Sequence, residues 1–309
     1  MNFSVVGVGE VLWDLLLTGP QLGGAPANFA YHARALGAEA LVITRVGNDD
    51  YGREIIRRFR EMGLPHSTVQ VDETAPTGTA TVELSGDGLA HFTIQNNVAW
   101  DYLAATPEAV AVARKADAIC FGSLAQRGES SRAAIQQLVS AASADALRVC
   151  DINLRQHFYS RELIEQSLQL ANVLKLNDDE LPTLAGMFSL NGSAERKIEQ
   201  QIERLAQTFG LRLVALTRGA NGSLLYQKGG EEDEARWSNC PSRPVQVVDT
   251  VGAGDSFTAT LVLGLLRKMD LDELNLLANE VARYVCSHAG ATPSLPAEFA
   301  KYFSPSPPR

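Results

Sequence analysis

Asp-Thr-Val-Gly-Ala-Gly-Asp occupies residues 249–255, and an apolar segment follows it up to Leu266. This segment predicts a helix that begins just after the paired glycines, because its apolar residues recur at helical spacing. They are Phe257, Leu261, Val262 and Leu265. The first amide groups of a helix lack partners within it and lie at the positive end of its dipole, so this loop is suited to bind phosphate through main chain. Asp255 stands in the first turn, where a carboxylate is either a partner of the dipole or a base beside an arriving phosphoryl group.

The complete string Asp-Thr-x-Gly-Ala-Gly-Asp resembles the C-terminal signature of the ribokinase-like (PfkB) carbohydrate kinases. In that family the last Asp is the catalytic base and the Gly-Ala-Gly amides form the anion hole. The resemblance implies that Asp255 takes the proton from a sugar hydroxyl. It also implies that the amides of Gly252, Ala253 and Gly254 stabilise charge on the phosphoryl group.

A second glycine-rich segment, Gly-Gly-Ala-Pro-Ala-Asn at residues 23–28, precedes an Ala-rich helix that ends at Gly37. Small residues let a ligand approach the backbone, although a close-packed helix start has the same composition. The segment resembles the N-terminal PfkB signature of fructokinase-like members, which implies that Gly24 and Asn28 contact substrate hydroxyls. Asp14 is expected just past a strand end, where it is either a turn residue or an acceptor for the same hydroxyls.

Alternating strand and helix patterns predict an α/β fold, a doubly wound and mostly parallel sheet flanked by helices. The expected strands are residues 3–9, 40–46, 118–121, 147–151, 173–176 and 213–216, and the expected helices are 53–62, 107–114, 130–142, 256–266 and 271–287.

Residues 79–84 and 90–95 predict a β-hairpin, because Ser-Gly-Asp-Gly joins two short alternating segments. The resemblance implies one ribokinase-like domain, residues 1–309, with a small β-sheet lid of about residues 10–20 and 66–100 over the sugar. A lid suits a kinase, because water would otherwise compete for the phosphoryl group.

Three further segments carry polar residues after predicted strands. Arg155, in Asp-x-Asn-x-Arg, is either a surface residue in a salt bridge or a cation that holds phosphoryl oxygens; the resemblance to sugar kinases favours the second. Asn177-x-x-Glu180 resembles the family element that organises Mg²⁺, its waters and the nucleotide phosphates. Mg²⁺ commonly keeps several of its waters, so one carboxylate acting partly through water is sufficient to hold it. The remaining nucleotide-side residues implied by the resemblance are Thr217, Gly219 and Gly222 near the ATP phosphates, and Asp249 and Ser294 beside a possible K⁺.

The overall composition argues against several classes of partner. The chain has a net charge of -9, so it lacks the basic excess that binding to nucleic acid or an anionic membrane requires. Its four cysteines lie far apart without metal-like spacing, and no basic segment before Arg34 forms a signal peptide. These two features lead us to expect a cytoplasmic, reduced protein. The apolar run 256–266 is also too short to span a bilayer.

The predicted function is an ATP-dependent sugar kinase, with fructose as the first substrate. No Lys or Arg occurs between Arg60 and Arg114, so the proposed lid lacks the donors that an anionic sugar needs. Alternatives are a kinase for 2-keto-3-deoxygluconate bound by Arg155, a ribose kinase, a nucleoside kinase, or a non-catalytic nucleotide-binding regulator. A nucleoside would need an aromatic platform such as Trp13, Phe92 or Trp100. The resemblance further implies a homodimer formed through the lid.

Overall fold

The computed structural model describes residues 2–16, 19–84, 90–190, 197–230 and 234–304. Within them the large sheet has nine strands in the order β13-β12-β11-β10-β9-β8-β1-β4-β5. The seven strands from β5 to β11 in this order are parallel, whereas β12 and β13 are antiparallel additions at one edge. The strands are β1 Ser4–Val8, β4 Glu39–Gly47, β5 Val69–Asp72, β8 Ala118–Phe121, β9 Leu147–Asp151, β10 Val173–Asn177, β11 Leu213–Thr217, β12 Ser223–Gln227 and β13 Arg236–Cys240.

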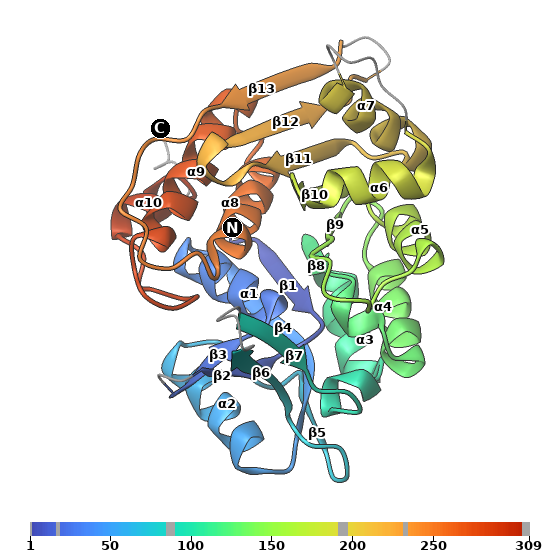
Figure 1. The fold of residues 1–309 in the computed structure, drawn as a ribbon, viewed down its shortest axis with the longest axis vertical. Coiled ribbons are helices and arrows are strands. Elements are labelled where there is room, and N and C mark those ends of the chain that lie inside the picture. The colour runs from blue at the N-terminus through green and yellow to red at the C-terminus, as the bar shows by residue number, and fades with distance from the viewer. Residues whose placement is uncertain (1, 17–18, 85–89, 191–196, 231–233, 305–309) are drawn as a thin grey trace.

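Helices cover both faces of this sheet, as the alternation of strands and helices predicts (Figure 1). One face carries α1 Ala25–Ala35, α2 Asp50–Glu61, α8 Ala253–Leu266 and α9 Leu271–Cys286. The other carries α3 Pro107–Lys115, α4 Glu129–Ala141, α5 Arg161–Leu170, α6 Glu180–Phe188 and α7 Lys197–Phe209. Short helices complete the list: η1 Ala99–Tyr102, η2 Leu124–Gln126, η3 Gly219–Asn221 and α10 Ala297–Lys301.

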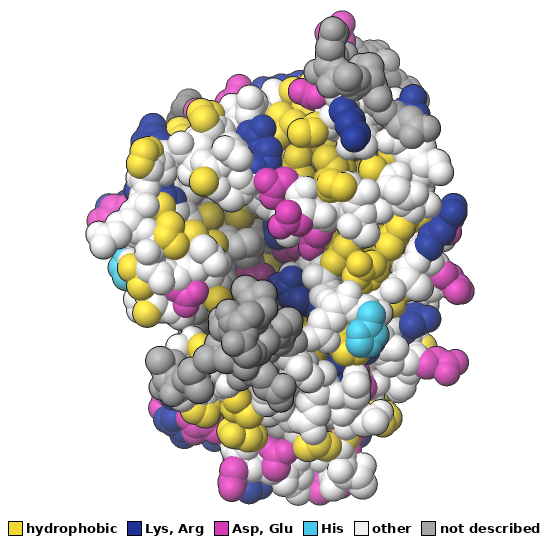
Figure 2. All heavy atoms as spheres, viewed as in Figure 1, with side chains coloured by type: hydrophobic (Ala, Val, Ile, Leu, Met, Phe, Trp, Pro, Cys, Tyr) yellow, Lys and Arg dark blue, Asp and Glu magenta, His cyan; other side chains and the backbone are white. Residues whose placement is uncertain are grey.

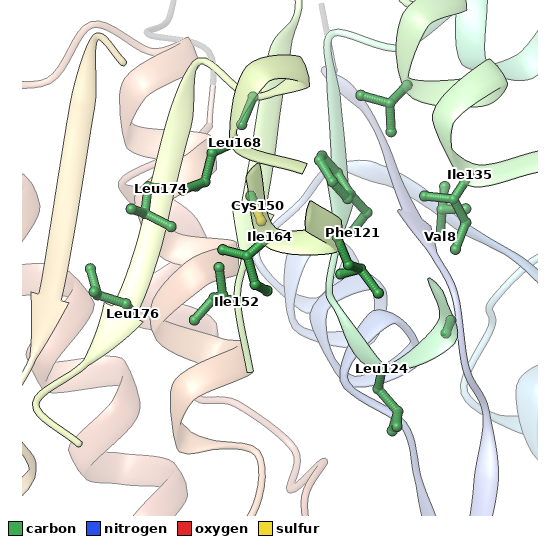
Figure 3. Packing of buried hydrophobic residues seen from close by; sticks show 14 of the residues in the cluster. Val8, Phe121, Leu124, Ile135, Cys150, Ile152, Ile164, Leu168, Leu174 and Leu176 are labelled. Atoms are coloured by element: carbon green, nitrogen blue, oxygen red, sulfur yellow. The ribbon is translucent and has the colours of Figure 1, made fainter. Parts of the chain in front are cut away.

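The second of these faces packs as a continuous apolar layer between the sheet and its helices. Figure 3 shows Cys150 and Ile152 of β9 beside Leu174 and Leu176 of β10, with Ile164 of α5 packed against them. Because side chains alternate along a strand, the residues between these point to the opposite face, toward α1 and α8.

Helix α8 is buried on nearly every side and not only on the face that the sequence predicts. All residues from Ser256 to Leu265 are buried, because the helix lies on the sheet between α1 and α9. Gly264 allows α9 to approach closely, since a Cβ at this position would collide with Leu274. The surrounding core therefore fixes the position of the first turn of α8, which carries Asp255.

A separate four-stranded sheet, in the order β3-β2-β6-β7, lies in the lower half of Figure 1. Its strands are β2 Leu12–Leu16, β3 Gly19–Gly23, β6 Gly78–Leu84 and β7 Ala90–Ile94. The predicted hairpin is present as the antiparallel pair β6–β7, and its connection at residues 85–88 lies outside the described residues. No helix in the described part of the chain is long and apolar enough to cross a membrane.

Two expectations about this small sheet are wrong. The range 66–100 includes β5, which pairs with β4 in the large sheet, with Thr44 opposite Val69; short edge strands like β5 give no sequence signal for which sheet they join. Asp14 lies in the middle of β2, opposite Gln21 of β3, and not just past a strand end. After Gly9 the chain leaves the large sheet and at once begins a new strand.

Candidate active site

The two glycine-rich signature segments meet where the large sheet ends. Parallel strands present their carboxyl ends at one edge, which is where α/β sheets bind ligands. There α1 brings Asn28 against the first turn of α8, and Asn28 Nδ2 donates a hydrogen bond of 2.8 Å to Asp255 Oδ2. Two segments that are 227 residues apart in the chain thus form one site.

Asp255 is in an environment that strengthens it as a base. Burial, together with the nearby charge of Asp151, raises the pKa of Asp255 to about 6, against the opposing effects of Asn28, Lys175 and Arg155. At neutral pH the side chain is therefore an anion that binds a proton more readily than an ordinary aspartate.

Glycine opens both helices at positions that other residues would disturb. Gly24, the residue before α1, has φ 114°, and a Cβ there would lie 2.6 Å from the carbonyl oxygen of Glu10. Gly252, the residue before α8, has φ 79°, and a Cβ there would collide with the carbonyl of Ala291. No side chain caps α8, and the Ala253 amide makes only a long 3.3 Å hydrogen bond to the Thr250 carbonyl, so the first turn can still present amides to an anion.

Asp14 and Arg155 approach this site from the small sheet and from the segment after β9. Burial raises the pKa of Asp14 while Arg155 lowers it, and Arg155 has the same lowering effect on Asp255. The guanidinium is therefore close enough to act on both carboxylates. Figure 2 shows acidic side chains and a basic one around the hollow in the middle of this face.

Asn177 and Glu180 form a closed hydrogen-bonded turn between β10 and α6. Glu180 accepts 2.8 Å hydrogen bonds from the amides of Leu154 and Asn177, and Asn177 Oδ1 accepts one of 2.9 Å from the Glu180 amide. Glu180 is therefore buried, whereas Asp178 and Asp179 are exposed as expected of a solvated helix start. The turn fixes the segment that leads to Arg155.

Two loops expected to contact the nucleotide lie at the same edge of the sheet or near α8. Thr217 ends β11 directly opposite Asn177, and Gly219 and Gly222 form the turn that follows. Asp249 joins the loop before α8 to the loop after α9, because it accepts hydrogen bonds from the amides of Val251 at 3.0 Å and Gly290 at 3.1 Å. The carbonyl of Ser294 accepts a bond from the Tyr284 hydroxyl.

A model of the family described as pfkB family carbohydrate kinase matches residues 19–298. The chain belongs to this family. It is 30% identical over 320 residues to Fructokinase-1 of Zea mays, with 95% of both proteins covered, and 28% identical over 315 residues to a sugar kinase of Pyrococcus horikoshii, with 93% of this chain and 91% of that protein covered.

Solved structures of the Pyrococcus horikoshii sugar kinase have the same fold. One has a TM-score of 0.80 at 27% identity, and the match covers 97% of both chains. A structure in complex with ATP has a TM-score of 0.73 at 25% identity, covering 93% of this chain and 94% of that one. The predicted family and the predicted doubly wound fold with a smaller sheet are therefore confirmed.

Several buried polar residues around Asp255 in this carbohydrate kinase were not predicted from the sequence. Glu10, two residues after β1, is buried, and burial raises its pKa to about 7 against the lowering effects of a backbone hydrogen bond and of Arg155. Lys175 and Thr258 both bind Asp151 at the site. A signal for Lys175 exists, since it is the only charged residue in the apolar strand Val173–Asn177.

Proposed function

We propose that the protein is an ATP-dependent kinase that transfers the γ-phosphoryl group to a primary hydroxyl of a neutral sugar, with fructose as the preferred substrate. The observation that carries the proposal is the 2.8 Å hydrogen bond between Asn28 and Asp255, because it joins the glycine-rich sugar segment to the phosphate loop. The fructokinase relatives support fructose as the substrate. The ATP complex of the Pyrococcus horikoshii kinase supports ATP as the phosphoryl donor.

In the proposed reaction Asp255 accepts the proton of the sugar hydroxyl as its oxygen attacks the γ-phosphorus, and the bond from that phosphorus to ADP breaks. The amides of Gly252, Ala253 and Gly254 donate to the negative charge that develops on the phosphoryl oxygens. Arg155 is exposed and lies near Asp255, so its guanidinium can hold further phosphoryl oxygens.

A neutral sugar suits the charges of the described site. Asp14 accepts hydrogen bonds from hydroxyls but repels a carboxylate or phosphate, and Asn28 and the close backbone at Gly24 supply the remaining polar contacts. Besides Arg155, Lys175 is paired with Asp151, and the Arg127 side chain binds Asp101 at 2.8 Å and stacks on the Trp100 ring. The Arg127 side chain is therefore held by contacts within the protein and does not bind a substrate anion.

The nucleotide would lie along the ends of β10 and β11, near Asn177, Thr217 and Gly219. No cluster of three or more His, Cys, Asp or Glu side chains suited to a metal occurs among the described residues. Both Glu180 oxygens already accept hydrogen bonds from backbone amides. Glu180 would therefore contact Mg²⁺ through the waters of the ion, and the phosphates would hold the ion directly. Bound Mg²⁺ would neutralise phosphate charge, and Asp249 and Ser294 would supply oxygen ligands for K⁺.

The test compares kcat/KM for fructose, fructose 6-phosphate and 2-keto-3-deoxygluconate under one set of conditions, with ribose and adenosine included. We expect fructose to give the highest value. A preference for either anion would overturn the neutral-sugar assignment and make Arg155 the first candidate for binding the substrate anion. A preference for adenosine or ribose would replace fructose, and no turnover of any compound would favour a regulatory protein.

A further inference from the structure

A buried ion pair lies directly beneath the phosphate loop. Asp151 of β9 and Lys175 of β10 stand opposite each other in neighbouring parallel strands, and Lys175 Nζ lies 3.0 Å from Asp151 Oδ1. Their side chains are only 7% and 8% exposed. Because their strand neighbours Cys150, Ile152, Leu174 and Leu176 fill the core on the far face (Figure 3), the pair points toward α8.

The pair contacts the start of α8 at two points. Thr258 Oγ1 donates a 2.8 Å hydrogen bond to Asp151 Oδ2 and lies 3.0 Å from the carbonyl oxygen of Gly254. A Cβ at position 254 would lie 3.0 Å from Lys175 Nζ, so the ammonium group packs against the backbone of the proposed anion hole. Asp151 and Asp255 also line one small cavity together with Phe29 of α1.

We propose that Asp151 and Lys175 are a positioning pair for phosphoryl transfer, which fastens the start of α8 to the ends of β9 and β10 and balances charge beneath Asp255. Lys175 alone would stabilise the Asp255 carboxylate and make it a weak base. Asp151 alone would keep the Asp255 carboxyl protonated, and a protonated carboxyl cannot act as the base. The inference rests on the proposed role of Asp255 as the base.

The electrostatics of the site agree with this balance. Asp151 raises the pKa of Asp255 while Lys175 lowers it, although burial is the largest influence. Burial would lower the pKa of Lys175, but the carboxylates of Asp151, Glu180 and Asp255 raise it above its ordinary value, so the ammonium stays charged. The charged groups around Asp255 and the pair come from five elements or their ends: Glu10 after β1, Asp14 on β2, Asp151 on β9, Arg155 after β9, Lys175 on β10 and Glu180 on α6.

The test is a pair of variants, Asp151→Asn and the double variant Asp151→Asn with Lys175→Met. The first keeps the shape but leaves Lys175 unbalanced, so the acid limb of the kcat–pH profile should move down by about one pH unit. The plateau rate should also fall, because the base is weaker. The double variant removes both charges and should return the acid limb close to the parental position, which a merely structural role would not do.

Two controls keep the outcomes distinct. Arg236→Met breaks the exposed pair between Arg236 and Asp270, 2.8 Å apart, and should leave the acid limb unchanged. Titration of the ¹³C-labelled Asp255 carboxyl reports the same shifts without turnover. The profile is measured on whichever sugar is turned over, so an error about fructose does not affect it.

An unchanged Asp255 titration in Asp151→Asn, or a double variant that moves it further down, would overturn the positioning pair. If Asp151→Asn does not fold, the double variant still tests the proposal. An Asp255 carboxyl that titrates at a pH far from the parental value in the double variant would contradict a balanced pair. By contrast, full turnover by an Asp255→Asn variant would refute the proposed base while the carboxyl titration of the parent remained measurable.

Discussion

Replacing Asp255 by Asn removes the proposed base with little change of shape. The remaining side-chain oxygen can still accept the hydrogen bond from Asn28 Nδ2, which is 2.8 Å long, so the site should keep its structure. General-base assistance is worth about 10²–10⁴-fold in rate, so kcat should fall by at least that factor, equivalent to about 3–5 kcal/mol of barrier. ATP should still bind, because the proposed nucleotide contacts do not include this carboxylate.

The same substitution should stabilise the folded protein at neutral pH. Burial, with the charge of Asp151, raises the pKa of Asp255 from an ordinary 3.8 to about 6. At a pH below 3.8 the Asp255 carboxyl is protonated in both the folded and the unfolded chain. As the pH rises from the lower value to the upper one, only the folded chain keeps the proton, and by neutral pH the folded state has lost about 3 kcal/mol of unfolding free energy. A variant that cannot ionise avoids this loss.

The assay measures kcat, ATP affinity by calorimetry, and thermal unfolding of parent and variant at about pH 4 and about pH 8. The variant should gain stability over the parent at the higher pH relative to the lower one. Near-parental kcat would show that Asp255 is not the base. A stability difference that is the same at both pH values would refute the argument from the raised pKa. Asp145→Asn, at an exposed carboxylate outside the site, is the matched control and should leave the difference between the two pH values unchanged.

Asn28→Ala should raise KM for the sugar and move the acid limb of the rate profile upward, since the Asn28 hydrogen bond lowers the pKa of Asp255; steady-state kinetics across pH check this, and an unmoved limb with unchanged KM would contradict it. Glu180→Gln should raise the Mg²⁺ concentration for half-maximal rate, because the new side chain cannot accept both the Leu154 and Asn177 amides; an unchanged titration would remove Glu180 from the metal site. The proposed lid-mediated homodimer predicts a sedimentation mass of two chains, and a mass of one chain would count against it.

Buried elements could be predicted from the sequence with accurate bounds. The strands β8 Ala118–Phe121 and β9 Leu147–Asp151 begin and end where expected, because strands covered on both faces are short apolar runs. Helices α5 and α7 were not predicted, although each has a signal. Ser160 caps α5, because its hydroxyl accepts a hydrogen bond from the Leu163 amide. In α7 the buried apolar residues Ile202, Leu205 and Ala206 recur on one helix face.

The contacts between distant segments could not be predicted in the same way. Lys175 is visible as a charge in an apolar strand, but its partner is fixed only when parallel pairing places it opposite Asp151. The position of Asp14 depends in the same way on the small sheet, where β2 pairs with β3 on one side and β6 on the other. Local patterns name the residues of the site, whereas sheet register decides which of them meet.

The sequence left two interpretations of Asp255, a partner of the helix dipole or a base, and the contacts of the side chain favour the base. A capping carboxylate in the first turn gains from the dipole, and that gain lowers its pKa. The pKa of Asp255 is instead raised, because the side chain is buried beside Asp151. Moreover, its hydrogen-bond donor is Asn28 of another helix, and no side chain caps α8. An anion held at a cost in stability, at a helix start that no side chain caps, is better explained by proton transfer than by stabilisation of the helix.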